Sequence, residues 1–338
     1  MSIVFTGGGT GGHLAIVDSV KEYVKGDKVY IGSTSGLDTT WYKDDNSFSA
    51  KYFLETKSVV DKGKVGKVLM LLKIFKEAFK AKKILKKHNA KVVFSVGGFS
   101  AAPAAFAAIM SRTPLIIHEQ NAYIGNLNRI LKPFAKEVIS PYNNGTIQID
   151  APIKQIFIDT YHTREELKSI LISGGSQGSV FLNNLALKLA PYFQEKGIKI
   201  YHQAGIKNEK EVIEAYKKLG IKAEVFGFTK ELDKIINQAD FAIARAGSST
   251  LWEFVANGLP TLFIPYPYAA NDHQYYNAKY LADKNLAYVL RENEITEDKV
   301  KDIIENINLK EISTKLPTLI KPDGAKEIAK ILMNFSDL

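Results

Sequence analysis

Ile3-Val-Phe-Thr-Gly-Gly-Gly-Thr-Gly-Gly-His13 is a short apolar run followed directly by a cluster of glycines. The apolar run predicts a buried strand. The glycines predict a tight turn into a helix, where backbone N–H groups can approach an anion closely. The second half of the chain repeats this form at Ile170-Leu-Ile-Ser-Gly-Gly-Ser176. The repetition predicts two domains that begin in the same way.

Both halves continue as short apolar runs separated by helical patterns. The runs cover residues 3–6, 28–31, 92–95, 114–117 and 137–139 in the first half, and 170–173, 198–202, 223–226, 241–244, 261–264 and 287–289 in the second. Alternation of this kind predicts a parallel sheet with helices on both faces. The predicted fold class is therefore α/β, with two doubly wound, Rossmann-like domains.

A turn-rich segment, Tyr142–Asp159, separates the two series; it contains Pro152 and lacks helical periodicity. We place the first domain at residues 1–150 and the second at residues 151–322. A chain of 338 residues is long enough for two such domains. A last helix, predicted at Ala325–Asn334, could pack on either domain.

Composition excludes several kinds of site. The chain has no cysteine, which excludes disulfides, thiol nucleophiles and thiolate metal sites. Its six histidines show no metal-ligand spacing and it contains no Asp-X-Asp motif, so we predict no metal site. The N-terminus runs straight into a strand, and no segment reaches the roughly 18 apolar residues of a membrane-spanning helix. We therefore expect a cytoplasmic location.

The formal charge of +9 is concentrated in the first half of the chain. Residues 1–150 hold 21 Lys+Arg against 12 Asp+Glu, whereas the remainder holds 24 of each. Residues 62–87 alone contribute ten lysines against one glutamate. This asymmetry points to a polyanion or an anionic membrane surface. Aromatic residues are sparse among these lysines, which argues against nucleic acid as the partner.

Residues 65–88 are predicted to form one long helix with two apolar stripes, although a helix needs only one to pack on a sheet. The second stripe consists of Val65, Val68, Leu72, Phe75 and Phe79, and Lys73, Lys76, Lys80, Lys83 and Lys87 lie beside it. An apolar stripe flanked by lysines is typical of a helix that lies on anionic lipid. The alternative is that another loop covers the stripe and that the lysines only solvate the surface.

Gly7, Gly9 and Gly12 match the G-x-G-x-x-G spacing of dinucleotide-binding turns. The acidic residue that a nicotinamide site needs after the second strand is missing, because Gly32-Ser-Thr34 stands there, and this disfavours a dehydrogenase. His13 lies at the positive end of the following helix, which favours a neutral imidazole that can accept a proton. It could equally cap the helix or line a wall.

Two further loops follow predicted strands of the first domain, Ser95-Val-Gly-Gly-Phe-Ser100 and His118-Glu-Gln-Asn121. The carboxyl ends of parallel strands are where open α/β sheets bind ligands. Together with His13, the second loop has enough donors and acceptors to bind a sugar. Glu119 is a second candidate base, or alternatively a salt-bridged wall residue.

The second domain has its own candidate site at Arg245-Ala-Gly-Ser-Ser-Thr-Leu-Trp-Glu253, which leads into a helix predicted at Leu251–Asn257. Apolar neighbours surround Glu253, and a buried carboxylate needs a partner. The two hydroxyls of a ribose would satisfy both oxygens, and an internal ion pair with Arg245 or a lysine would do so equally well. The turn Gly174-Gly-Ser-Gln-Gly178 could stabilise a diphosphate at a helix N-terminus, or simply close a β-α unit.

In this order and spacing, the motifs resemble those of the MurG family, the bacterial peptidoglycan N-acetylglucosaminyltransferases that make lipid II from lipid I. The similarity runs along nearly the whole chain. The motifs are Gly8-Gly-Thr-Gly-Gly-His13, Gly97-Gly-Phe99, His118-Glu-Gln-Asn-Ala122, Gly174-Gly-Ser-Gln-Gly178, Arg245-Ala-Gly247, Glu253, Gly258-Leu-Pro260, Asp272-His-Gln274 and Asn277. The resemblance implies a GT-B fold, in which two Rossmann-like domains face a cleft and the last helix, residues 323–338, returns to the first domain.

The resemblance also implies roles for single residues, with the donor UDP-GlcNAc held mainly by the second domain and the lipid-linked acceptor by the first. Glu253 would bind the ribose hydroxyls, Ser176 and Gln177 the diphosphate region, and Gln274 with Asn277 the GlcNAc hydroxyls. The full donor-binding set is Thr10, Gly11, Gly12, Asn121, Lys154, Ser176, Gln177, Arg245, Glu253, Gln274 and Asn277.

Two positions depart from the family pattern. Lys154 stands where the family commonly has arginine, which keeps the positive charge but loses the bidentate fork, so the grip on the diphosphate is in doubt. Ala101 replaces the usual serine of the second glycine loop, which puts one anion contact in doubt.

The implied reaction is an inverting displacement. The C4 hydroxyl of MurNAc in lipid I, undecaprenyl-pyrophosphoryl-MurNAc-pentapeptide, attacks the anomeric carbon of GlcNAc, and UDP leaves. His13 is the predicted base and Glu119 the second candidate. No cofactor is implied.

Such an enzyme would serve peptidoglycan synthesis, and with it cell shape and division. It would work as a peripheral protein at the cytoplasmic face of the inner membrane, where other cell-wall synthesis proteins could be partners. The alternatives are a UDP-GlcNAc 2-epimerase, a transferase acting on another lipid, and a non-catalytic sugar-nucleotide module.

Overall fold

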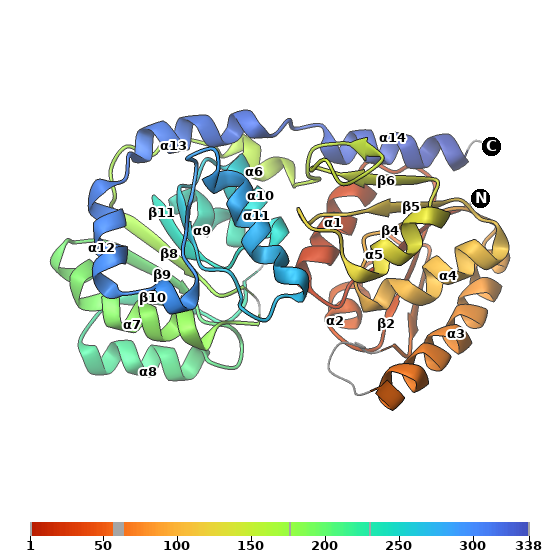
Figure 1. Cartoon of the computed structure of the whole chain (residues 1–338), viewed down its shortest axis with the longest axis horizontal. Coiled ribbons are helices and arrows are strands. Elements are labelled where there is room, and N and C mark those ends of the chain that lie inside the picture. Colours follow the sequence, from red (N-terminus) through yellow and green to blue (C-terminus); the bar gives the residue numbers. More distant parts are fainter. Residues whose placement is uncertain (1, 57–63, 176, 230, 337–338) are drawn as a thin grey trace. The chain divides into compact units, whose positions relative to one another are not determined.

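The computed structural model describes residues 2–56, 64–175, 177–229 and 231–336, and of residues 64–69, 71 and 336 it describes the backbone alone. The chain divides into two compact units (Figure 1). The first unit comprises Met1–Ile153 and Pro322–Leu338, and the second comprises Lys154–Lys321. The first unit is therefore built from both ends of the chain.

Within the described residues, each unit contains one sheet whose paired strands all run parallel. The strands are β1 Ser2–Thr6, β2 Asp27–Ser33, β3 Ala50–Leu54, β4 Ala90–Ser95, β5 Leu115–His118, β6 Glu137–Ser140 and β7 Ile147–Gln148 in the first unit, and β8 Ser169–Ser173, β9 Lys199–Gln203, β10 Ala223–Phe226, β11 Phe241–Ala244, β12 Thr261–Phe263 and β13 Tyr288–Val289 in the second. Their orders are β3-β2-β1-β4-β5-β6-β7 and β10-β9-β8-β11-β12-β13. Both orders reverse direction beside the first strand of the unit, which is the doubly wound arrangement that the sequence predicts.

Helices fill most of the connections between strands. They are α1 Gly11–Lys21, α2 Asp38–Tyr42, α3 Lys64–Lys87, α4 Ala102–Ser111, α5 Asn126–Leu131, α6 Gln155–Asp159, α7 Val180–Glu195, α8 Glu209–Leu219, α9 Leu232–Gln238, α10 Ser248–Ala256, α11 His273–Ala282, α12 Glu297–Asn306, α13 Leu309–Lys315 and α14 Gly324–Ser336. Local sequence sets several of their ends. The Ser179 hydroxyl accepts a 3.3 Å bond from the N–H of Leu182 at the start of α7, and Gly220 ends α8 in the left-handed conformation.

The first sheet carries a separate apolar core on each face. On one face, Leu14 and Val17 of α1 pack with Ile328 and Leu332 of α14 over the strands. On the other face, residues of α3 and α4 cover the strands, and these two helices lie side by side in Figure 1. Because helices cover both faces, the central strands are apolar throughout instead of alternating. The last helix of the chain therefore belongs to the core of the first unit.

In the second unit one apolar cluster lies under α7, α8 and α12. Leu182, Leu189 and Phe193 of α7 form its centre, and Val212 of α8 and Val300 of α12 complete it. Elsewhere in this unit, helix α10 contacts helices α6 and α11. Trp252 and Phe254 of α10 are buried there, which explains the apolar sequence around Glu253.

The structure adds elements that the sequence analysis did not predict. The edge strand β3 contains Lys51, and its first four residues are only partly buried, so its apolar signal is weak. Strand β7, also at an edge, has two residues, and helix α6 lies within the segment that we expected to be a plain linker. Helix α10 begins at Ser248, three residues before the predicted start.

Candidate active site

In each unit the glycine turns lie where the strand order reverses. The loop after β1 holds Gly7–Gly12 and its neighbour after β4 holds Gly97 and Gly98. In the second unit the loops after β8 and β11 occupy the corresponding positions. Ligands of open α/β sheets bind at these switch points, so both units place their motifs where binding is expected.

The two glycine loops of the first unit approach each other more closely than side chains would allow. A Cβ on Gly7, whose φ is +121°, would lie 2.7 Å from the carbonyl oxygen of Gly97. A Cβ on Gly98, whose φ is +78°, would lie 2.5 Å from the carbonyl oxygen of Gly8. Glycine is required at both positions because of the close approach and the positive φ. The loops therefore form one interlocked structure at the N-terminus of α1.

His13 lies in the first turn of α1, next to Gly11 and Gly12. Its Nδ1 is 2.7 Å from the hydroxyl of Thr10, so the predicted donor residue Thr10 contacts the predicted base directly. His118, at the end of β5, lies close enough to His13 for their charges to repel each other. Burial lowers the pKa of His118 to about 3, and the nearby Gln120 side chain opposes this only partly. His118 is therefore neutral at physiological pH.

The Glu119 carboxylate is surrounded by donors. One oxygen accepts from the backbone N–H of Asn121 at 2.9 Å and from its side-chain amide at 3.1 Å. The other accepts from the N–H of Gly125 and the side chain of Asn128, both at 2.8 Å. These four donors occupy the acceptor positions of both carboxylate oxygens. This geometry argues against Glu119 as the base and makes it the residue that orders the loop carrying Asn121.

In the second unit, the loop that contains Gln177 packs against the loop after β9. Gly178 has a φ of +76°, and a Cβ there would lie 2.3 Å from the carbonyl oxygen of Ala204. Gln177 is exposed, and Ser176 lies outside the described residues. Ser179, which we did not predict, caps α7. A serine just before an apolar helical run is a signal that could have identified it.

Arg245 is one of the predicted donor-binding residues, and its guanidinium also binds several groups of the protein. It donates to the carbonyls of Ile264 and Pro265 at 3.0 and 3.1 Å and to the Ser179 hydroxyl at 2.7 Å. It also forms an ion pair with Glu292, a residue that belongs to none of the motifs above. Arg245 thus links the loop after β11 to the N-terminus of α7 and sets the shape of the site.

Glu253 lies on α10, and it forms no ion pair with the described residues. Its side chain is half-buried on α10 among apolar neighbours. Burial raises the pKa of its carboxyl to about 7; the positive charge of Lys154 opposes this, and the charge of Asp233 adds to it. Because Arg245 pairs with Glu292, the alternative of an Arg245–Glu253 pair is wrong.

Gln274 and Asn277 fix α11 against the loops of the site. The side-chain oxygen of Gln274 accepts a 3.0 Å bond from the N–H of Tyr266. Asn277 is buried and donates to the carbonyl of Ala246 at 3.2 Å. Of the predicted residues of the second unit, Arg245 directly follows β11, Glu253 lies on α10, and Asn277 binds the loop between them. No group of three or more His, Asp or Glu side chains in the described ranges is arranged to hold a metal ion.

Comparison with known proteins identifies the family. The glycosyltransferase family 28 N-terminal domain matches residues 3–140, and the family 28 C-terminal domain matches residues 169–330. A protein of Sulfurovum sp. (strain NBC37-1) named UDP-N-acetylglucosamine--N-acetylmuramyl-(pentapeptide) pyrophosphoryl-undecaprenol N-acetylglucosamine transferase is 50% identical over 338 residues, covering 99% of each chain. The chain belongs to glycosyltransferase family 28, and within it to the MurG family. A Campylobacter hominis member of the same name is 48% identical and covers 97% of this chain and 96% of its own.

The solved structures support the predicted fold class of this family 28 member. The crystal structure of Acinetobacter baumannii MurG has a TM-score of 0.77 to this chain, with 24% identity over 98% of this chain and 99% of that one. The GT-B class and the family predicted from the motifs are both confirmed.

Proposed function

We propose that this protein transfers N-acetylglucosamine from UDP-GlcNAc to the C4 hydroxyl of MurNAc in undecaprenyl-pyrophosphoryl-MurNAc-pentapeptide, forming lipid II from lipid I. Two relatives that are 48 and 50% identical carry the name of this transferase. The structural observation that carries the proposal is Glu253, whose carboxylate has an apolar setting and a raised pKa but no cation of the described residues paired with it.

On the donor side, Glu253 accepts hydrogen bonds from the two ribose hydroxyls. A ribose diol supplies two donors to one carboxylate, which offsets the cost of burying it. Lys154 lies near enough to influence Glu253 electrostatically and supplies a positive charge for the diphosphate. The N-terminus of α7, capped by Ser179, stabilises the charge that develops on the departing UDP.

On the acceptor side, Nε2 of His13 takes the proton of the C4 hydroxyl. The hydroxyl oxygen forms a bond to the anomeric carbon of GlcNAc while the bond from that carbon to the diphosphate breaks, and its electron pair leaves with UDP. For Nε2 to accept a proton, the ring must carry its proton on Nδ1, which then donates to the Thr10 hydroxyl 2.7 Å away. Thr10 would thus hold the tautomer that the reaction needs.

Helix α3 is the proposed membrane contact. Its buried face includes Ile74, Ala78 and Leu85, whereas the side chains of Leu72, Phe75 and Phe79 are 62, 49 and 57% exposed. The exposure of these three side chains among the described residues supports this contact. The side chains of Val65 and Val68 lie outside what the structure describes.

Exposed apolar side chains beside lysines favour binding to an anionic lipid surface. Lys76 and Lys83 are exposed on the same helix, whereas Lys73 and Lys80 are partly offset by ion pairs with Glu55 and Glu77. No helix in the described residues is both long and apolar enough to cross a membrane. We infer a peripheral enzyme on the cytoplasmic face of the inner membrane, where its lipid-linked acceptor would be found.

An acceptor panel tests the function against its rivals. UDP release from UDP-GlcNAc is measured with a lipid I analogue, with an undecaprenyl diphosphate that lacks MurNAc, and without acceptor. We expect release with the lipid I analogue alone. Release in the absence of acceptor, with formation of ManNAc, would indicate a 2-epimerase, and UDP binding without release would indicate a non-catalytic module.

A further inference from the structure

Asp38 has a fully buried carboxylate that accepts a hydrogen bond from the first glycine loop, Gly7–Gly12. Its Oδ2 accepts a 2.6 Å hydrogen bond from the backbone N–H of Gly9, and its Oδ1 accepts one of 3.0 Å from the N–H of Ser33. The hydroxyl of Tyr30 lies 3.0 Å from Oδ1 and 2.9 Å from the carbonyl oxygen of Gly7. Asp38 therefore joins the loop after β1 to the end of β2.

Two glycines are shaped to this carboxylate. A Cβ on Gly8 would lie 2.5 Å from an Asp38 oxygen, and a Cβ on Gly32 would lie 2.7 Å from the same oxygen. Contacts below 3.0 Å cannot be accommodated without a shift of the carboxylate. Gly8 is a variable position in the G-x-G-x-x-G pattern, and its close approach to the Asp38 carboxylate accounts for glycine there.

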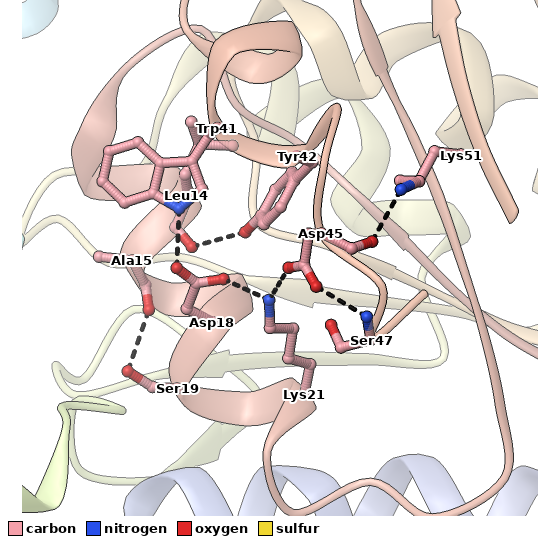
Figure 2. A network of polar contacts seen from close by, with 10 residues as sticks. All are labelled: Leu14, Ala15, Asp18, Ser19, Lys21, Trp41, Tyr42, Asp45, Ser47 and Lys51. Carbon is pink, nitrogen blue, oxygen red and sulfur yellow. Dashed lines mark hydrogen bonds and ion pairs between the residues drawn. The ribbon is translucent and has the colours of Figure 1, made fainter. Parts of the chain in front are cut away.

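The short helix α2, which begins with Asp38, is anchored to α1 by a second set of contacts. Figure 2 shows Trp41 donating to Asp18, Tyr42 donating to the carbonyl of Leu14, and Asp45 paired with Lys21. The Trp41 and Tyr42 bonds are 2.7 and 2.9 Å long. Helix α1 is thus held along its length by α2, and the loop in front of it is held by Asp38.

The geometry points to Asp38 as a positioning residue for the transfer reaction: by fixing the Gly9 peptide it sets the Thr10 hydroxyl that orients His13, together with the first N–H groups of α1. This inference rests on the proposed function for its chemistry. Gly9 directly precedes Thr10, and Thr10 contacts the imidazole at 2.7 Å. The first N–H groups of a helix have no acceptor within the helix, so their direction depends on how the preceding loop is held.

The first test reads the His13 ring and does not depend on turnover. Ring ¹⁵N shifts of His13, assigned with His13→Gln, report which nitrogen carries the proton. In the parent we expect the Nδ1-protonated neutral tautomer, and in Asp38→Asn a mixture of both tautomers, as in Thr10→Ala. The amide introduced by Asp38→Asn would direct N–H donors at Gly9 or Ser33, whose own N–H groups need an acceptor. Shifts identical to those of the parent would overturn the inference.

The second test uses turnover with UDP-GlcNAc and a lipid I analogue. We expect Asp38→Asn to lower kcat by a factor of at least ten, with an unchanged affinity for UDP that shows that the second unit is folded. Ser140→Ala is the matched control, because it removes a buried 3.1 Å bond to the N–H of Tyr142 in the same sheet without touching the glycine loop. Its kcat should fall less than threefold. Equal losses in both variants would mean that Asp38 contributes only to stability.

Gly8→Ala is a second variant for the case that Asp38→Asn does not fold. It keeps the Asp38 carboxylate and only displaces it. It should reproduce both the tautomer change and the loss in kcat, and parent-like behaviour in both would contradict the inference. An inactive parent would instead refute the proposed function, while the His13 spectra would still test the role of Asp38.

Discussion

The guanidinium of Arg245 is paired with the carboxylate of Glu292, on the 3-10 helix Glu292–Glu294. This pair removes Arg245 from the internal ion pairs that the sequence left open for Glu253, and a lysine stays the other internal candidate. Arg245 is the cationic residue nearest to Glu253 in the sequence, and it is paired with Glu292 instead. Glu253 keeps a half-buried carboxylate, which under the proposed function binds the two ribose hydroxyls.

Removing the Glu253 carboxylate should weaken donor binding without unfolding the protein. The loss of hydrogen bonds to a charged acceptor costs about 1.5 to 3 kcal/mol, so calorimetry should show UDP affinity falling by roughly 10- to 150-fold in Glu253→Ala. Glu224→Ala, an exposed carboxylate on β10 of the same unit, is the control and should bind like the parent. Equal UDP affinity in Glu253→Ala and the parent would show that Glu253 does not bind the ribose.

The affinity for UDP should depend on pH through Glu253. Burial raises the pKa of its carboxyl to about 7, so in the free protein it is protonated below that pH and charged above it. The charged form is the better acceptor for ribose hydroxyls. Affinity should therefore be constant above about pH 8 and fall by up to roughly tenfold per pH unit below pH 7. Glu253→Gln should show a flat profile over the same range, and a parallel fall in this variant would assign the effect to another group.

Turnover should not require a divalent metal at the diphosphate. The sequence has no Asp-X-Asp motif, and Lys154 with the N-terminus of α7 can stabilise the negative charge. Activity in EDTA should stay within about twofold of the untreated enzyme when substrate is saturating. Loss of turnover in EDTA that magnesium restores would show that a metal carries this charge.

Replacing the exposed stripe of α3 should weaken membrane binding selectively. We expect Leu72→Ser with Phe79→Ser to reduce co-sedimentation with anionic vesicles, because burial of apolar side chains and nearby lysines both contribute. Added salt should weaken binding of the parent, and UDP affinity should not change. Leu219→Ser, at an exposed position in the second unit, is the control. If the variant co-sediments as much as the parent at both low and high salt, the stripe does not contribute to lipid binding.

The sequence predicted the α/β class, the doubled architecture and most central strands, because strands buried on both faces leave continuous apolar runs such as residues 170–173. It did not predict β3 or β7, because edge strands are half-exposed and carry weaker patterns. Glycine turns also marked the switch points correctly, since a close approach between loops requires glycine whatever the ligand.

Pairing between side chains was beyond sequence patterns. Glu292 is 47 residues from Arg245 and follows no motif, and Asp38 lies five residues beyond the end of β2. The four donors around Glu119 could not be foreseen either, because two of them are backbone N–H groups whose direction depends on the loop conformation. The sequence patterns therefore predicted where the loops lie. The structure shows which residues, such as Arg245 and Glu119, form the hydrogen bonds that shape these loops.

Analysis of the product tests whether the protein transfers N-acetylglucosamine to C4 of MurNAc. The protein is incubated with UDP-GlcNAc and a lipid I analogue, and the lipid-linked product is isolated for mass spectrometry and for NMR of its anomeric proton. We expect a product heavier by one N-acetylhexosamine and joined to C4 of MurNAc by a β linkage, because donor and product have opposite anomeric configuration in an inverting displacement. An α linkage, attachment at another hydroxyl, or an acceptor recovered unchanged would contradict it.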